Sequence, residues 1–197
     1  MAESFIAEAR REQIIQACIR TLSEIGYNKV SLTKIAKNAK ISTGLISYHF
    51  ADKADLIHHT LMYLVADQLH YISECLAAAK KGATEQLKAF IEASLAYQAT
   101  HYENNIAMIE IVFNAQTEDG TPFYLLAAKE ADGLELLLTE ILIAGKNKKE
   151  FATDFDPALV ATIIQGAIGE IMLKNCDHEQ YETYKNELTR MALKMLA

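Results

Sequence analysis

The sequence predicts an all-α protein in which a three-helix segment is followed by a larger helical bundle. Two observations favour this class over a mixed or all-β fold. Apolar residues recur at steps of three, four or five along almost the whole chain, as they do on one face of a helix. No alternating run of β-branched residues reaches the length of a strand. Clusters of glycine, proline, asparagine and aspartate divide the periodic stretches into about nine helices.

The first two helices have clear start and stop signals. Residues 6–25 carry the helical period, and Gly26 directly after them supplies a C-terminal stop. Ser31 is placed to cap a second, short helix over residues 32–39. A serine cap accepts a hydrogen bond from a backbone N–H of the first turn, so this residue type favours a helix start here.

The third and fourth helices follow the same logic. Ser42 is placed to cap a helix from Thr43 to about Phe50. Asp52 is placed to cap a fourth helix, with Asp55 in its first turn, where the helix dipole favours an anion. No strong breaker occurs before Gly82, so the fourth helix is expected to span nearly thirty residues.

Beyond Gly82 the breakers predict about five more helices. The expected stops are Asn104-Asn105, residues 119–122, residues 145–149, Asp156-Pro157 and residues 175–177.

Charge is distributed unevenly along the 197 residues, whose net charge is −7. Residues 1–60 hold eight basic and six acidic side chains, whereas residues 61–197 hold eleven basic and twenty acidic ones. Five lysines fall within residues 29–53, beside a single acid, Asp52. The acidic total therefore conceals a local positive patch of the kind that attracts phosphate.

The composition also indicates a compartment. The three cysteines are far apart in the sequence and odd in number, which is typical of a reducing compartment. The longest apolar stretch without a charge, residues 157–169, is too short to cross a bilayer. Acids occupy the N-terminus where a signal peptide would have basic residues. We therefore expect a cytoplasmic protein with no membrane partner. The cysteines are Cys18, Cys75 and Cys176.

The segment 31–50 carries the clearest chemistry. Ala36 and Ala39 are small and three residues apart, so the second and third helices can approach closely at a sharp angle. The third helix then presents short hydroxyl, amide and cationic groups, which suit base edges and phosphates in a major groove. Its exposed residues are expected to be Thr43, Gly44, Ser47, Tyr48 and His49.

This segment resembles the DNA-binding domain of the TetR (tetracycline repressor) family of bacterial regulators, over roughly residues 10–60. The matching residues are Ala17, Gly26-Tyr27, residues 30–36 (VSLTKIA), residues 42–50 (STGLISYHF), Lys53, Leu56 and Ile57. The resemblance implies a helix-turn-helix domain over residues 1–52 and an all-helical effector-binding and dimerisation domain over residues 53–197.

The resemblance also implies roles for individual residues. Thr33 and Lys53 correspond to phosphate contacts, Thr43, Gly44 and Ser47 face bases, and Tyr48 and His49 touch the backbone and groove wall. The family usually has Gly in the turn where this chain has Lys40, and a non-glycine residue in a left-handed conformation costs about 1 kcal/mol. The predicted DNA-binding set is Ser31, Thr33, Lys34, Ser42, Thr43, Gly44, Ser47, Tyr48, His49 and Lys53.

Simpler interpretations of these residues stay open. Ser31 and Ser42 act first as helix caps, whether or not they also touch phosphate. Tyr48 could be a packed ring, His49 a helix end without a contact, and the lysines an ordinary solvated face.

The acidic region contains no catalytic motif, so we expect no enzyme, no cofactor and no metal site. The adjacent His58 and His59 point about 100° apart on a helix and are poorly placed to share a metal. A helical bundle can instead hold an effector between its helices. Candidate effector residues, for each of which core packing is the simpler alternative, are Met62, Phe90, Tyr97, His101, Met108, Glu110, Phe113 and Phe123.

Glu110 lies in line with an apolar stripe, where an unpaired carboxylate would be costly. Three interpretations remain: it pairs with His101, Tyr97 or a lysine; it faces a cavity and binds a polar or cationic effector; or the helix is rotated so that Glu110 is solvated.

The last two helices carry more apolar surface than a lone bundle needs to bury, which indicates a homodimer. Two glycines in the first of them would permit close backbone approach. The predicted dimer interface is Val160, Ile164, Gly166, Ile168, Gly169, Ile171, Met172, Leu188, Met191 and Met195.

Together these features predict a homodimeric transcriptional repressor that binds a palindromic operator and releases it when a small molecule binds the acidic domain. The alternative is an α-helical ligand-binding or protein-interaction module with a vestigial helix-turn-helix. The retained lysine patch beside so acidic a body argues against that alternative.

Overall fold

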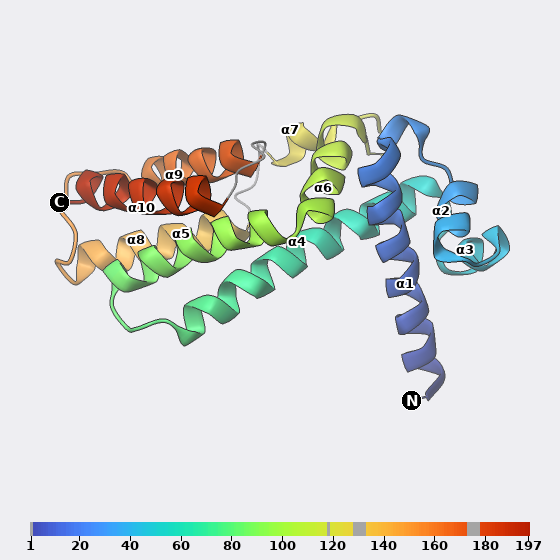
Figure 1. The fold of residues 1–197 in the computed structure, drawn as a ribbon, viewed down its shortest axis with the longest axis horizontal. Coiled ribbons are helices and arrows are strands. Elements are labelled where there is room, and N and C mark those ends of the chain that lie inside the picture. Colours follow the sequence, from blue (N-terminus) through green and yellow to red (C-terminus); the bar gives the residue numbers. More distant parts are fainter. Residues whose placement is uncertain (1, 118, 128–132, 173–177) are drawn as a thin grey trace. The chain divides into compact units, whose positions relative to one another are not determined.

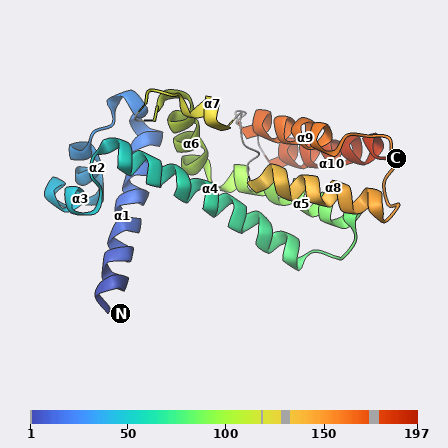
Figure 2. The ribbon, with the colours of Figure 1, turned by 180° about the vertical axis from the view of Figure 1, so that it is seen from behind.

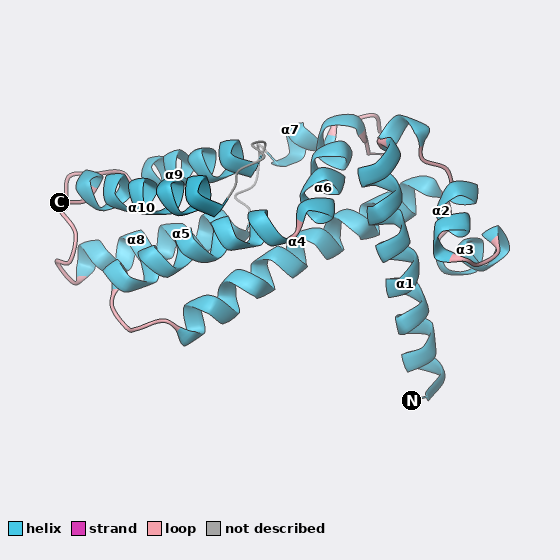
Figure 3. Ribbon diagram, in the orientation of Figure 1, coloured by secondary structure: helices cyan, strands magenta, loops and turns pink. Residues whose placement is uncertain are grey.

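A computed structural model describes residues 2–117, 119–127, 133–172 and 178–197. These residues form ten α-helices and one 3₁₀-helix, with no strand among them and one isolated bridge between Gln116 and Pro122 (Figure 1, Figure 3). The helices are α1 (Ala2–Ile25), η1 (Tyr27–Lys29), α2 (Leu32–Ala39), α3 (Thr43–His49), α4 (Lys53–Ala78), α5 (Ala83–Thr100), α6 (Tyr102–Asn114), α7 (Phe123–Ala127), α8 (Gly133–Asn147), α9 (Pro157–Met172) and α10 (His178–Met195). In the described part of the chain, no helix is long and apolar enough to cross a bilayer.

The all-α prediction is confirmed, and the predicted caps hold their helices. Gly26 follows α1 with φ 73°, a left-handed conformation that glycine adopts without strain. At the start of α4 the Asp52 carboxylate accepts a hydrogen bond from the Asp55 N–H (2.9 Å), and the Asp55 carboxylate accepts one from the Ala51 N–H (2.9 Å). The first of these bonds pairs an N–H that a helix start otherwise leaves unpaired, and the second ties the preceding residue to the same turn.

Of three boundary predictions beyond α5, one is wrong, one is confirmed and one lies outside the described residues. The break after α5 falls at His101, and Asn104 and Asn105 lie inside α6, where the Asn104 side chain donates to Asp67 Oδ2 (3.2 Å). The stop predicted at residues 145–149 is confirmed, since α8 ends at Asn147. The short α7 follows the turn at residues 119–122 and brings the α-helices of the described residues to ten instead of nine. The stop predicted at residues 175–177 lies outside the described residues.

The chain divides into two compact units. Unit 1 comprises residues 1–67 and 102–130, and unit 2 comprises residues 68–101 and 131–197. This division by contacts does not coincide with the functional division predicted between residues 52 and 53, which stays a prediction.

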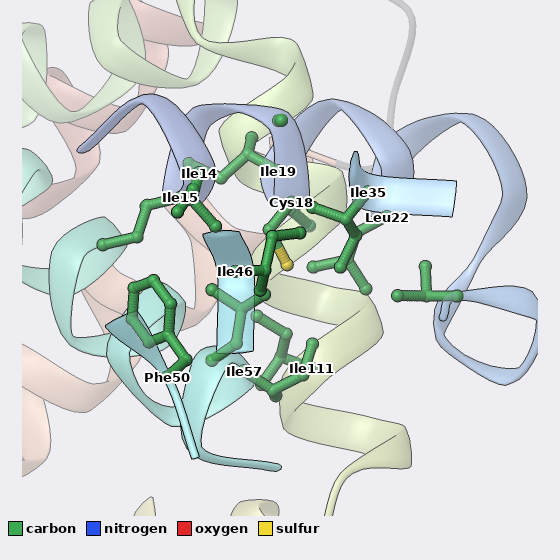
Figure 4. Packing of buried hydrophobic residues seen from close by; sticks show 14 of the residues in the cluster. Ile14, Ile15, Cys18, Ile19, Leu22, Ile35, Ile46, Phe50, Ile57 and Ile111 are labelled. Carbon is green, nitrogen blue, oxygen red and sulfur yellow. The ribbon is translucent and has the colours of Figure 1, made fainter. Parts of the chain in front are cut away.

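Unit 1 is built around one apolar core to which α1 contributes most. Ile14, Cys18 and Leu22 of α1 meet Ile35 of α2 and Ile46 of α3, all buried (Figure 4). Helices α4 and α6 close the same core through Ile57 and Ile111 (Figure 4). The two helices of the helix-turn-helix are therefore fixed by the side chains that the sequence marks as apolar.

Unit 2 is a bundle in which α5 packs against α8, α9 and α10, and α8 packs against α9 (Figure 2). Phe90 and Ile91 of α5 and Ile164 of α9 are buried at its centre. Gly145 of α8 is required by close packing, because a Cβ there would lie 2.0 Å from the Phe151 ring.

Candidate nucleic-acid interface

The helix-turn-helix is formed by α2, a tight turn and α3. The Ser31 hydroxyl accepts a hydrogen bond from the Lys34 N–H (3.4 Å), and the Ser42 hydroxyl accepts one from the Leu45 N–H (3.2 Å). Between the helices, Lys40 adopts φ 56° and ψ 42°, the left-handed conformation. A lysine occupies this conformation at a cost of about 1 kcal/mol relative to glycine. The turn thus keeps its geometry despite the residue change noted in the sequence.

Polar side chains of α1 hold the helix-turn-helix by its backbone. Arg11 donates to the His49 carbonyl at the end of α3 (2.6 Å), and Gln13 donates to the Ala39 carbonyl at the end of α2 (3.1 Å). The Arg11 guanidinium also lies 4.4 Å from the centre of the Phe50 ring. Sequence patterns missed these residues because their partners are 38 and 26 positions away.

The outer face of α3 is free for an external partner. Thr43, Gly44, Ser47 and Tyr48 are exposed, Tyr48 with 80% of its surface accessible, while Ile46 faces the core. A Cβ added at Gly44 would meet only the Ser42 hydroxyl, at 3.9 Å. Packing therefore does not require glycine there, and its bare surface leaves room for another molecule to approach.

The predicted residues flanking this face differ in exposure. Thr33, Lys34 and Ser42 are exposed, whereas Ser31 and His49 are half-buried. The His49 ring lies edge-on to Tyr48, with 5.1 Å between ring centres. The Lys34 ammonium donates to the Lys29 carbonyl (2.8 Å). The exposed lysines around α2 are Lys29, Lys34, Lys37 and Lys40.

Lys53 is tied to the protein more closely than the other lysines. Its ammonium donates to the Tyr27 carbonyl (3.1 Å) and lies 4.3 Å from the centre of the Tyr27 ring. Burial lowers the pKa of the Lys53 ammonium, and Cys18 nearby acts in the opposite direction. An ammonium has three N–H donors, so the hydrogen bond to Tyr27 leaves two for a phosphate.

Glu110 of α6 binds the backbone of Tyr27 as well, through the N–H instead of the carbonyl. Its carboxylate accepts a hydrogen bond from the Tyr27 N–H (2.8 Å) and a longer one from the Asn114 side chain (3.4 Å). A Cβ at Gly26 would lie 3.2 Å from the Glu110 carboxylate, so glycine also makes room for this contact. The carboxylate is therefore paired, but with backbone of the turn before α2 rather than with the side chains considered in the sequence.

The predicted effector residues divide between the two units. In unit 1, Phe123 is buried and Met108 partly buried in the core, whereas Met62 and Phe113 are exposed. In unit 2, the buried Tyr97 ring stacks on His101 at 4.1 Å between ring centres.

Of the predicted effector residues, only Phe90 lines a cavity in the described part of the structure. This cavity in unit 2 has a volume of about 140 Å³ and is also lined by Ser94 and Gln165. The sequence patterns did not select these two residues. Ser94 lies four residues after Phe90 on α5, and a polar residue in line with an apolar stripe is the signal that could have found it.

The predicted dimer residues also occupy different environments. Val160, Ile164 and Ile168 are buried in the core of unit 2, so the single chain already accounts for their burial. Ile171 and Leu188 are partly buried against that core, and Gly169 lines the cavity. Gly166, Met191 and Met195 are exposed, and the Met172 side chain lies outside the described residues.

The outer surface of α9 and α10 carries apolar side chains that the sequence did not single out. Leu159 and Ile163 of α9 are exposed, and a largely apolar groove of about 400 Å³ runs between α9 and α10. Leu188 and Met191 are among its lining residues.

The capped helix pair, the left-handed turn and the free outer face of α3 define a helix-turn-helix protein. The family model described as "Bacterial regulatory proteins, tetR family" matches residues 14–60. This match agrees with the resemblance that the sequence indicated, over less than half of the chain.

Named relatives match this chain over less than half of its length. The chain is 33% identical over 87 residues to the HTH-type transcriptional regulator BetI of Burkholderia ambifaria, and equally so to BetI of Burkholderia thailandensis. Each match covers 44% of this chain and 45% of the relative, so the chain spans less than half the length of the curated relatives it matches.

Solved structures share the fold over nearly the whole chain. FadR of Bacillus halodurans, a fatty acid degradation regulator, superposes with a TM-score of 0.79 and 23% identity, covering 93% of this chain and 94% of its own. FadR of Bacillus subtilis, solved in complex with stearoyl-CoA, gives a TM-score of 0.77 and 21% identity, covering 94% and 99%. At these identities the likeness concerns the fold alone.

Proposed function

We propose that this protein is a homodimeric transcriptional regulator that binds a palindromic DNA operator through α3 and releases it when a small molecule binds unit 2. This is the activity of a repressor rather than of an enzyme, and it places the protein in the cytoplasm with the DNA. BetI and FadR, to which the chain is similar, are named as regulators.

The outer face of α3 is the observation that carries the proposal. Its hydroxyl and aromatic groups contribute little to the fold, while Ile46 on the opposite side fixes the helix to the core. Exposed lysines surround α2, so phosphates can be neutralised beside the face that reads bases. Hydroxyl and ring groups of this kind suit the major groove.

The proposed DNA-binding unit is a dimer, so it requires a second copy of the chain. Exposed Leu159, Ile163 and Met191, beside the apolar groove between α9 and α10, support a twofold interface through these helices. A dimer would place two recognition helices on successive major grooves, about 34–36 Å apart. Release by an effector requires that the effector bind the DNA-incompetent state more tightly than the competent one.

Fluorescence anisotropy with DNA from upstream of the protein's own gene tests the proposal. We expect Tyr48→Ala to weaken binding about tenfold, because a direct contact is typically worth 1–3 kcal/mol. Lys34→Ala should weaken binding to all sequences and reduce the slope of log K against log salt by about one.

Lys148→Ala is the matched control, since Lys148 is an exposed lysine of unit 2 far from α3 in the sequence. It should leave both affinity and salt slope unchanged. Sedimentation velocity would confirm that every variant is still a dimer. Wild-type protein that shows no salt-sensitive binding to any upstream palindrome at micromolar concentration would contradict the proposal and favour the vestigial helix-turn-helix.

A further inference from the structure

The cavity in unit 2 is walled by four helices. Phe90 and Ser94 come from α5, Leu134 from α8, and Gln165, Ile168 and Gly169 from α9. The C-terminal part of α4 contributes Gln68. The volume of about 140 Å³ is close to that of an engineered apolar cavity, about 150 Å³, that is known to bind benzene.

Two polar atoms at this cavity lack a hydrogen-bond partner among the described residues. The Ser94 side chain is 2% exposed, and its hydroxyl oxygen makes no hydrogen bond. The Gln165 amide nitrogen is also buried and makes none. Each unsatisfied buried group costs about 1–3 kcal/mol, so native proteins rarely keep one without a purpose. Two such atoms in the wall of one cavity point to a molecule that enters it.

The rest of the wall limits the chemistry of that molecule. None of the described residues that line the cavity is charged. A charged ligand would therefore be buried without a counter-ion, which is strongly unfavourable. Phe90, Leu134 and Ile168 offer apolar contact, and the Gln165 amide nitrogen needs an acceptor such as a carbonyl oxygen.

The cavity also has unused room at Gly169. A Cβ built there meets no atom within 4 Å, and Gly169 is half-buried on α9. The space is therefore open on the α9 side as well as beside Ser94.

We infer that this cavity binds a small neutral molecule with a ring-sized apolar body and one carbonyl or hydroxyl edge, recognised by Ser94 and Gln165. A long acyl chain does not fit this volume. The inference deepens the proposed function, on which it rests for the consequence that the bound molecule acts as the effector.

Benzamide and benzoate are suitable probes because they have nearly the same shape and differ in charge. Calorimetric titration of the full-length wild-type protein at neutral pH should show benzamide binding at least tenfold more tightly than benzoate. Benzamide should also raise the Tm, because a ligand that binds only the folded state stabilises it. Stearoyl-CoA should leave the Tm unchanged. Equal affinity for the two aromatic probes, no binding of benzamide, or a Tm increase with stearoyl-CoA would each overturn the inference.

Two variants locate the binding. Ser94→Ala and Gln165→Leu should each weaken benzamide about fivefold, which corresponds to one hydrogen bond of about 1 kcal/mol. Ser73→Ala is the matched control, because Ser73 is exposed on α4 and does not line the cavity. Unchanged benzamide affinity in both cavity variants would overturn the assignment of the recognising groups.

The free protein supplies an independent readout. Because the Ser94 hydroxyl has no partner, Ser94→Ala should leave the Tm of the ligand-free protein unchanged or higher; a clear decrease would show a structural role and contradict the inference. The DNA titration separates the two proposals. Normal DNA binding without benzamide binding contradicts only the cavity assignment, whereas benzamide binding without DNA binding contradicts only the proposed function.

Discussion

Polar side chains serve different ends in the two compact units. In unit 1 they reach across the sequence to backbone groups: Glu110 and Lys53 bind the two sides of Tyr27, and Arg11 binds the end of α3. In unit 2, Glu150 makes one such contact, with the Thr84 N–H, but the buried polar atoms of Ser94 and Gln165 line a cavity and have no hydrogen-bond partner among the described residues. The polar side chains named in unit 1 are thus hydrogen-bonded in the free protein, whereas unit 2 keeps two buried polar atoms without a hydrogen-bond partner.

This difference matches two requirements of the proposed regulator. A surface that reads DNA needs a fixed shape before the DNA arrives, since ordering it on binding would reduce affinity. A site that responds to a small molecule needs an interaction that exists only when the molecule is present. The polar contacts of unit 1 meet the first requirement, and the unpaired atoms of unit 2 suit the second.

The largest effect is expected from Gly145→Ala, which tests whether unit 2 is loosely packed throughout or only at the cavity. The added Cβ would lie 2.0 Å from the buried Phe151 ring. Overpacking typically costs 1–3 kcal/mol, so the Tm should fall by roughly 3–10 °C. Gly44→Ala in α3 is the control, because a Cβ there would meet only the Ser42 hydroxyl, at 3.9 Å, so the Tm of this variant should not fall. If Gly145→Ala has the same Tm as wild type, the packing of unit 2 is loose enough throughout to accommodate the added methyl group.

Glu110→Gln tests the polar contacts of unit 1. The neutral amide keeps the shape but replaces a charge-assisted hydrogen bond to the Tyr27 N–H, which should lower the free energy of unfolding by about 1 kcal/mol. The operator affinity should fall with it, because the turn before α2 is less firmly held. Urea unfolding and DNA anisotropy measure the two effects. Glu103→Gln, an exposed acid in the first turn of the same helix, should change neither.

Lys40→Gly sharpens the comparison by removing the one local strain in the helix-turn-helix. Because Lys40 has φ 56°, glycine should raise the free energy of unfolding by up to about 1 kcal/mol. Lys37→Gly, inside α2, should lower it by a similar amount because glycine is unfavourable in a helix interior. Two changes of the same sign in urea unfolding would contradict the left-handed turn.

The smallest effect is expected at Glu150, which caps α5 in unit 2. Its carboxylate accepts a hydrogen bond from the Thr84 N–H (3.0 Å), and Gly82 before the helix offers no side-chain cap. Hydrogen bonds from the backbone of Thr84 and Ala83 lower the pKa of the Glu150 carboxyl. The stabilisation is therefore complete above the unfolded pKa, about 4.3, and is lost as pH falls through the lower folded pKa.

Glu150→Gln should consequently be less stable than wild type at pH 7, and the difference should shrink in acid. Thermal unfolding across pH 2–7 measures it, with Glu140→Gln, an exposed acid of α8, as the control. A difference that stays constant down to the lowest pH would show that the carboxylate charge is not what stabilises the helix start.

Much of unit 1 could be predicted from the sequence because its signals are local. Ser31, Ser42 and Asp52 each cap a helix that begins within one residue of them, so short segments decide the boundaries. Glu110 could not be assigned in this way. Its partner, the Tyr27 N–H, lies 83 residues away and is a backbone group, which no side-chain pattern marks.

The cavity of unit 2 could not be predicted from the sequence for a related reason. The apolar stripe on α5 predicts Phe90 as a candidate, but Ser94 and Gln165 become a site only when α5 and α9 pack together. The predicted interface stripe on α9 illustrates the same point: Val160 and Ile164 are apolar because the unit's own core needs them. Periodicity identifies a buried face without identifying what buries it.

The bare outer face of α3 has a consequence for how such proteins diverge. Gly44, Ser47 and Tyr48 are exposed, and the core residue Ile46 lies on the other side of the helix. After a gene duplication, one copy can therefore exchange these residues and acquire a different target sequence while its fold stays as stable as before. Selection on DNA preference and selection on folding then act on separate positions, so a new regulator can arise by single substitutions without an unstable ancestor.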